Sequence, residues 1–149
     1  MHSSCHPYDL LSRAAIEVSP NRKQILTVLI NSKQALSPKI ILDKLRRTRT
    51  FDKVTLYRIL DLLVKKKVLR KIAAHDGSAR YEIMCSEHHP VHAHFICRMC
   101  ARIECLEDNE IDKLMNMIKK IKFRMFEGVD LKFEGLCLSC QKQNSRRRQ

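Results

Sequence analysis

Two Cys-x-x-Cys pairs have a spacing that suits a single metal ion. Cys97 and Cys100 form the first pair, and Cys137 and Cys140 form the second. A Cys-x-x-Cys turn brings two thiolates close enough to share one tetrahedral ion, and two such turns fill a four-coordinate zinc shell. Because four sulfur ligands leave no open position, the sequence predicts a structural zinc site. Two unliganded reduced pairs, or a redox dithiol, are the alternatives.

Histidines just before the first pair predict a second, regulatory metal site. His92 and His94 alternate, and alternate residues on a strand point to the same face, so their imidazoles converge. Neutral imidazole is the commonest metal ligand of proteins. A solvated histidine-rich loop is the alternative. The residues that complete the site stay open between several candidates: Cys85, Cys105, Glu82 and His75.

The segment before these ligands has the pattern of a winged helix-turn-helix. Helices are expected over 8–16 and 20–31, from Ser37–Pro38 onwards, and after Asp52, because Ser-Pro and Asp are helix-start residues. Strands over 68–72 and 80–84 flank turn residues at 75–78. In this fold the last helix lies in the major groove of DNA and the hairpin flanks the backbone.

The last of these helices has the clearest pattern. Its apolar residues fall at i, i+3, i+4, i+7 and i+8, a single stripe: Leu56, Ile59, Leu60, Leu63 and Val64. Polar residues such as Lys53, Thr55, Tyr57 and Arg58 are left on other faces.

The rest of the chain predicts a small second domain, so the fold class is α+β. Short strands around 95–96 and 103–106, a helix over 111–118 and a half-buried strand over 129–134 are expected there. We therefore expect a winged-helix domain with its hinge strand at 1–84, a metal-binding dimerisation domain at 85–140, and a disordered basic tail at 141–149. A metal site that draws on both domains would fix their relative angle and act as a switch.

The positive charge is concentrated in the first 84 residues. These residues hold 17 Lys and Arg against 7 Asp and Glu, whereas residues 85–149 hold 12 against 9. This asymmetry favours a polyanionic partner for the first half of the chain. No apolar run approaches the ~20 residues that span a bilayer, and 1–10 lacks the pattern of a signal peptide. We expect a cytoplasmic protein with no membrane partner, in which metal ligation rather than disulfide pairing is the default for the seven cysteines. Cys5, which lies in a segment without a pattern, is expected to have no role.

Four segments together resemble the ferric uptake regulator superfamily of bacterial metal sensors: Val54–Leu60, Arg80–Glu82, His92–Cys100 and Gly135–Cys140. The resemblance implies a homodimer that binds double-stranded operator DNA in its metal-loaded form and represses metal-uptake genes. It implies that Tyr57 and Arg58 contact DNA, with Lys53 and Thr55 as neighbours. It also implies no small-molecule substrate and no enzymatic activity.

Departures from the family pattern favour its zinc-sensing branch. Gln34–Ala35 stands where iron and peroxide sensors have a histidine, and Cys105 stands where a carboxylate is usual, with Glu104 one residue earlier. Replacing oxygen ligands with sulfur moves a site towards zinc, so the second divalent metal is expected to be zinc as well. An iron-, manganese- or peroxide-sensing member of the same superfamily is the alternative. A zinc hydrolase or a thiol oxidoreductase is the remote alternative, since no catalytic motif accompanies the metal ligands.

Overall fold

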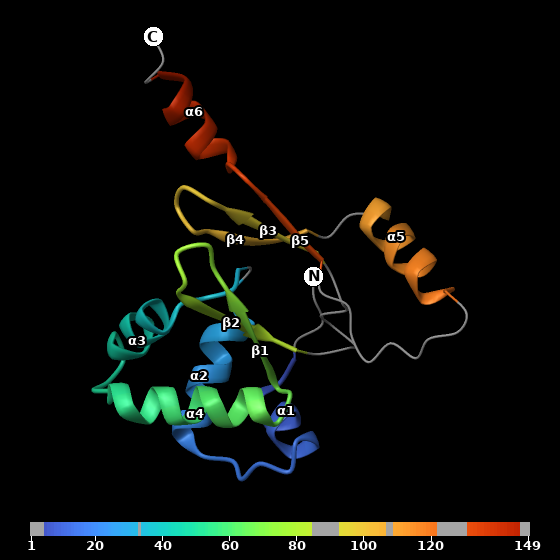
Figure 1. The fold of residues 1–149 in the computed structure, drawn as a ribbon. Helices are drawn as coiled ribbons and strands as arrows, with labels where there is room; N and C mark the ends of the chain where they lie inside the picture. Colours follow the sequence, from blue (N-terminus) through green and yellow to red (C-terminus); the bar gives the residue numbers. More distant parts are fainter. Residues whose placement is uncertain (1–4, 33, 85–92, 107–108, 122–130, 147–149) are drawn as a thin grey trace. The chain divides into compact units, whose positions relative to one another are not determined.

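The structure, a computed structural model, describes residues 5–32, 34–84, 93–106, 109–121 and 131–146 of the 149-residue chain. The chain folds into two compact units (Figure 1). The first comprises residues 1–73 and 77–90, and the second comprises 74–76 and 91–149.

The first unit begins with four helices, which start where the sequence predicts. They are α1 Pro7–Arg13, α2 Pro20–Ile30, α3 Pro38–Arg46 and α4 Lys53–Lys65. The side chains of Ser19, Ser37 and Asp52 each accept a hydrogen bond from a backbone N–H of the first turn that follows. These caps satisfy donors that the first turn of a helix leaves without a partner.

The core of this unit forms where the apolar stripe of α4 meets the other helices. Leu56, Leu60 and Leu63 are fully buried, and Ile59 is nearly so, as the stripe predicts. Cys5 also belongs to this core, with only 7% of its surface exposed. We expected no role for Cys5. A lone cysteine behaves as a small apolar residue, and here it packs where the chain enters α1.

A two-stranded hairpin completes the winged helix. Strands β1 Leu69–Ala73 and β2 Ala79–Ile83 pair antiparallel, with Gly77 in the turn at a φ of 76°. That left-handed conformation is accessible to glycine at no steric cost. Leu36 forms an isolated antiparallel bridge to Tyr81, so the segment between α2 and α3 attaches to the hairpin.

The second unit is a three-stranded sheet with two helices. Its elements are β3 Ala93–Cys97, β4 Ile103–Leu106, α5 Asn109–Lys119, β5 Leu131–Gly135 and α6 Leu138–Arg146. The strand order is β4-β3-β5, with β3 antiparallel to β4 and parallel to β5. Both units together confirm the α+β fold class. No helix among the described residues is long and apolar enough to cross a membrane.

Two expectations differ from the structure in this unit. Residues 141–146, which the sequence assigns to a disordered tail, are helical in α6. Gln and Lys are good helix formers, and burial of Cys140 at the start of α6 anchors the helix to the sheet region. Phe133 in β5 is 42% exposed rather than buried, because a strand face is covered only where another layer packs on it.

Candidate metal centres and nucleic-acid interface

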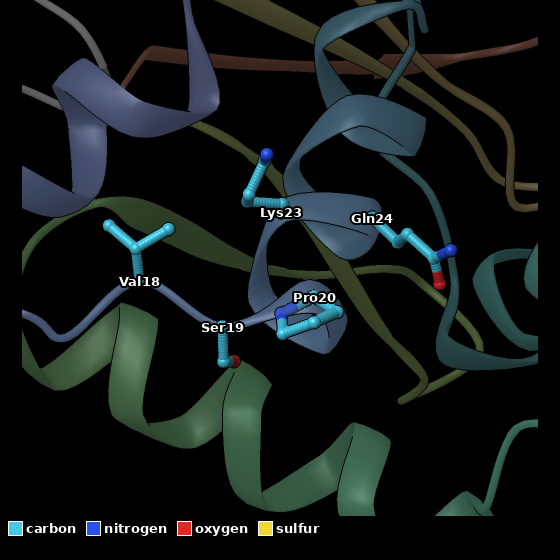
Figure 2. A pocket seen from close by; sticks show the side chains of 5 residues that line it. All are labelled: Val18, Ser19, Pro20, Lys23 and Gln24. Carbon is cyan, nitrogen blue, oxygen red and sulfur yellow. The ribbon is translucent and has the colours of Figure 1, made fainter.

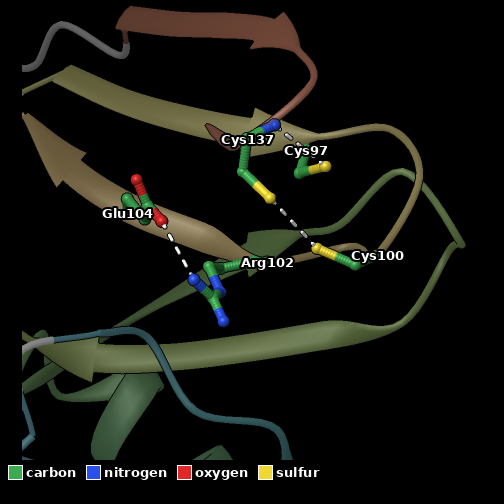
Figure 3. A network of polar contacts seen from close by, with 5 residues as sticks. All are labelled: Cys97, Cys100, Arg102, Glu104 and Cys137. Atoms are coloured by element: carbon green, nitrogen blue, oxygen red, sulfur yellow. Dashed lines mark hydrogen bonds and ion pairs between the residues drawn. The ribbon is translucent and has the colours of Figure 1, made fainter. Parts of the chain in front are cut away.

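The two Cys-x-x-Cys pairs meet at one end of the sheet in the second unit. Cys97 ends β3 and pairs in register with Gly135 at the end of the parallel strand β5. The second pair therefore emerges beside the first, and the four Sγ atoms lie within 4.8 Å of one another. Figure 3 shows the sulfur of Cys100 directed at that of Cys137, 3.8 Å away.

Backbone contacts hold this arrangement in place. The N–H of Cys137 donates to Sγ of Cys97 over 3.4 Å, and the N–H of Arg98 donates to the carbonyl of Gly135 over 2.9 Å. Gly135 suits this close approach, because a Cβ there would lie 3.2 Å from Cε2 of Phe95. The position tolerates a side chain only if the Phe95 ring moves.

The cysteine cluster has the electrostatics of a cation site. Burial raises the pKa of the Cys97 thiol, but backbone N–H groups of Cys137, Cys100 and Met99 outweigh it and lower that pKa to about 6. The hydrogen bond with Cys137, followed by burial and the other two sulfurs, raises the pKa of Cys140 to about 12. One thiol is thus readily deprotonated while a neighbour resists a further negative charge. A cation bound among the four sulfurs would offset the repulsion between the thiolates and favour their deprotonated form.

The donor set fits zinc. The six described cysteines are all free of disulfide bonds, and four sulfurs at mutual reach match a closed tetrahedral shell. Cys97, Cys100, Cys137 and Cys140 would hold the ion, which would supply a cross-link between the β3–β4 turn and the start of α6.

A second pair of donors lies further along the same sheet. His94 of β3 pairs directly with Cys105 of β4, so their side chains share a face. A ring nitrogen of His94 and Sγ of Cys105 lie within 4.8 Å, and His94 is fully buried. Glu104 pairs instead with Phe95 on the opposite face, where it lies 3.5 Å from the Arg102 guanidinium. Cys105 rather than Glu104 therefore accompanies His94.

Of the other candidate ligands, Glu82 and His75 belong to the described residues. Glu82 is a buried residue of β2 in the first unit, and its carboxylate lies 3.4 Å from the Arg70 guanidinium. His75 is exposed in the turn between β1 and β2. Cys85 and His92 lie outside the described residues.

The face of α4 opposite the buried stripe is open to solvent. Val54, Tyr57, Arg58 and Asp61 occupy positions i, i+3, i+4 and i+7 of this face, and all four are exposed. Val54 and Tyr57 are 57% and 40% exposed, respectively, which is high for apolar and aromatic residues of a helix. Val54 was not among the predicted DNA-contacting residues, although its spacing from Tyr57 and Arg58 places it on the same face.

Lys53 and Thr55 differ in their surroundings. Lys53 is exposed at the first residue of α4. Both the backbone N–H and the hydroxyl of Thr55 donate to the Asp52 carboxylate, over 2.7 and 3.0 Å. These bonds lower the pKa of Asp52. The hydroxyl of Thr55 thus serves the helix cap.

The sequence matches the ferric uptake regulator family over residues 13–133, which is most of the chain. The chain belongs to that family. Members of the family are metal-responsive transcription regulators and not enzymes. The match covers α2 to β2 of the winged helix and the strands β3 and β4 that carry His94 and Cys105.

Relatives and solved structures agree with this membership. The ferric uptake regulation protein of Helicobacter pylori is 29% identical over 133 residues, covering 88% of this chain and 86% of that protein. The solved structure of the H. pylori ferric uptake regulator, described as having three functional metal-binding sites, superposes with a TM-score of 0.74. It is 25% identical and the match covers 95% of this chain and 97% of that one.

A zinc uptake regulator solved in complex with zinc and DNA also shares the fold. It has a TM-score of 0.57 at 22% identity, covering 93% of this chain and 92% of that one. At this identity the likeness concerns the fold alone.

The first unit has a surface hollow at the start of α2. Val18, Ser19, Pro20, Lys23 and Gln24 line it around the first turn of α2, as Figure 2 shows. The lining contains no cysteine, histidine or carboxylate, so the hollow is not a metal centre.

Proposed function

We propose that this chain is a metal-dependent transcriptional repressor that binds operator DNA when a regulatory metal occupies a site built around His94 and Cys105. The pairing of these two donors across β3 and β4, with His94 fully buried, is the observation that carries the proposal. A fully buried imidazole beside a thiol is a fitting environment for a divalent cation. Membership of a family of metal-responsive regulators supports it.

The further ligands of this site are proposed from the sequence. His92 lies two residues from His94, and Cys85, Glu82 and His75 are the remaining candidates. A set of sulfur and imidazole donors would select zinc over harder metals. We therefore propose zinc as the regulatory metal, next to a structural zinc on Cys97, Cys100, Cys137 and Cys140.

Iron sensing is the second candidate. Two observations favour it: the similar H. pylori protein is named for ferric uptake regulation, and Glu82 is a buried carboxylate of the kind that harder cations prefer. The identity of the metal that restores DNA binding distinguishes the two candidates.

We propose a homodimer as the DNA-binding form. Strand β5 lies at an edge of the described sheet, and its Phe133 is 42% exposed in the single chain. Open strand edges and exposed aromatic side chains are features of surfaces that pair with a partner. Residues 1–84 would bind the DNA and 85–140 would pair the chains, in the cytoplasm, where the operator DNA lies.

Tyr57 and Arg58 on the exposed face of α4 are the proposed base-reading residues. Arginine reads guanine through two parallel hydrogen bonds, and an aromatic or apolar side chain packs against a thymine methyl. Lys53 and the neighbouring Thr55 would assist at the same end of the helix.

A metal-dependent selection of DNA tests this function. Genomic fragments that the chelator-treated protein retains would be compared with those retained after zinc, ferrous iron or manganese is returned. We expect zinc to restore selective binding to a common sequence at the lowest free metal concentration. Restoration by iron alone would favour the second candidate, and equal selection with and without metal would contradict the proposal.

The matched variant for this experiment is His94→Ala. It leaves the four-cysteine cluster intact, so we expect the structural zinc to remain while the metal no longer improves DNA binding. Cys5→Ala is the control, because Cys5 lies in the core of the other unit.

A further inference from the structure

A dense group of basic residues directly precedes α4. Residues 44–53 contain five Lys and Arg and a single acidic residue, Asp52. Arg46, Arg47 and Arg49 lie at the end of α3 and in the segment that joins it to α4, and all three are exposed. None of the proposed base-reading residues of α4 belongs to this group.

Two of the three arginines are held in place by neighbouring groups. Nε of Arg46 donates to the carbonyl of Phe51 over 3.1 Å. The Arg49 guanidinium lies over the Phe51 ring, 5.6 Å from its centroid, and donates to the side-chain oxygen of Asn21 in α2. Phe51 is itself 3% exposed, so the platform under Arg49 is part of the core.

The three arginines of the group have few acidic neighbours among the described residues. Among the described residues, Arg46, Arg47 and Arg49 form no ion pair with a carboxylate. The one acidic side chain in their segment, Asp52, accepts two hydrogen bonds from Thr55 to cap α4. Three guanidinium groups therefore lie beside the start of one helix, and a single carboxylate, that of Asp52, lies in their segment.

We propose that Arg46, Arg47 and Arg49 form a phosphate clamp that binds the DNA backbone at the border of the groove entered by α4. The clamp rests on the proposed DNA-binding function and adds the residues that set the position of α4. Guanidinium groups match phosphate oxygens with two parallel hydrogen bonds. Backbone contacts of this kind fix register and orientation, while base contacts supply the sequence preference.

The contacts that hold Arg46 and Arg49 preorganise these two side chains for a phosphate. A long side chain that is already held loses less conformational freedom when it meets a phosphate. Arg49 has both an aromatic platform and an amide acceptor that hold its guanidinium, whereas no side-chain hydrogen bond or ion pair among the described residues restrains Arg47. The clamp thus contains two arginines that are held in place, Arg46 and Arg49, and one, Arg47, that can adjust to the position of a phosphate.

The salt dependence of DNA binding tests the clamp. Fluorescence anisotropy with a labelled duplex of mixed sequence would give Kd between about 50 and 200 mM KCl. Each phosphate contact contributes about 0.9 to the slope of log K against log salt concentration. We expect the double variant R47A/R49A to lower the magnitude of this slope by about 2.

The charge-matched control is K142A/R146A in α6, which removes two exposed positive charges from the second unit. Its slope is expected to change by much less than that of R47A/R49A. Equal slopes for the wild type and R47A/R49A, or an equal loss in both double variants, would overturn the clamp alone. A wild type that binds no duplex, with or without added zinc, would overturn the proposed function as well.

Asn21→Ala tests the anchoring without changing charge. It removes the acceptor that holds Arg49. At fixed salt we therefore expect a Kd between that of the wild type and that of R49A, and an unchanged Tm. An affinity equal to that of the wild type would contradict a preorganised clamp.

Discussion

At the scale of single residues, Ala101 is held in an unfavourable backbone conformation. It follows the first cysteine pair, and its φ is 56°, in the left-handed region. Its N–H donates to the carbonyl of Cys97 over 2.9 Å, which closes the turn that places the two thiols. Glycine adopts this conformation without the steric cost that the Cβ of alanine brings.

Ala101→Gly is therefore expected to stabilise the second unit. A left-handed conformation costs a residue with a Cβ about 1–2 kcal/mol, and the greater freedom of glycine in the unfolded chain offsets part of the gain. The free energy of unfolding should rise by up to about 1 kcal/mol in thermal or urea denaturation.

The matched control is Ala93→Gly, at a fully buried residue of β3. Glycine within a strand weakens it, so this variant should lower the stability of the same unit. A fall in stability for Ala101→Gly would show that the turn does not carry the strain.

Single residues also show where sequence reasoning stops. The pairing of His94 with Cys105, rather than with Glu104, depends on the register between β3 and β4, and a shift of one residue would exchange them. The burial of Cys5 left no signal either, because an isolated cysteine in a polar segment has no periodicity. The spacing of each Cys-x-x-Cys pair predicts that its own two thiols lie close together. The meeting of the two pairs follows from the parallel pairing of β3 with β5.

At the scale of elements, the two faces of α4 have different roles: the buried face stabilises the fold, and the exposed face is the one proposed to contact DNA. Leu60 is fully buried, whereas Arg58 is exposed. Leu60→Ala should lower the free energy of unfolding by about 2–5 kcal/mol through the cavity it leaves. Arg58→Ala should leave Tm nearly unchanged and weaken binding to the selected DNA. Circular dichroism and anisotropy measured on the same samples check both, and wild-type affinity in Arg58→Ala would argue against the assignment of this face.

The cap of α4 predicts a pH dependence. Hydrogen bonds from the backbone and side chain of Thr55 lower the pKa of Asp52 in the folded protein. The ionised carboxylate therefore stabilises the fold above the ordinary Asp pKa of about 3.9, and this contribution is lost as pH falls through the lower folded value. The difference in Tm between the wild type and Asp52→Ala should be largest near neutral pH and shrink in acid.

Asp52→Asn is the control for this effect, because asparagine also caps helices but carries no charge. Its Tm should exceed that of Asp52→Ala by an amount that does not change over the same acid range. A wild-type advantage that stays constant down to the lowest pH would mean that the Asp52 carboxylate does not titrate as the cap requires.

Element boundaries were predictable where the chain carries explicit signals. Ser19, Ser37 and Asp52 all cap the helices that the sequence assigned to them. Helix α6 had no such signal, because its residues are polar and Cys140 is its buried anchor. The exposure of Phe133 could not be predicted either, since an alternating pattern indicates which side chains share a face and not whether anything covers it.

At the scale of the whole molecule, two units divide the chemistry between them. The net positive charge belongs mainly to the first 84 residues, which contain α4 and the phosphate clamp, while the four-cysteine cluster and the pair of His94 and Cys105 belong to the second unit. A metal that favours one arrangement of two such units shifts the population towards it, which is how binding in one unit would influence the other.

Metal content per chain tests this account most directly. The wild type, purified under reducing conditions and analysed for every divalent metal, should hold about two ions per chain, one of them zinc. His94→Ala should hold about one, as zinc, and Cys137→Ser should lose that zinc together with the folded second unit. A wild type that stays folded with no ion on its cysteines, or a His94→Ala variant that keeps both ions, would contradict the account.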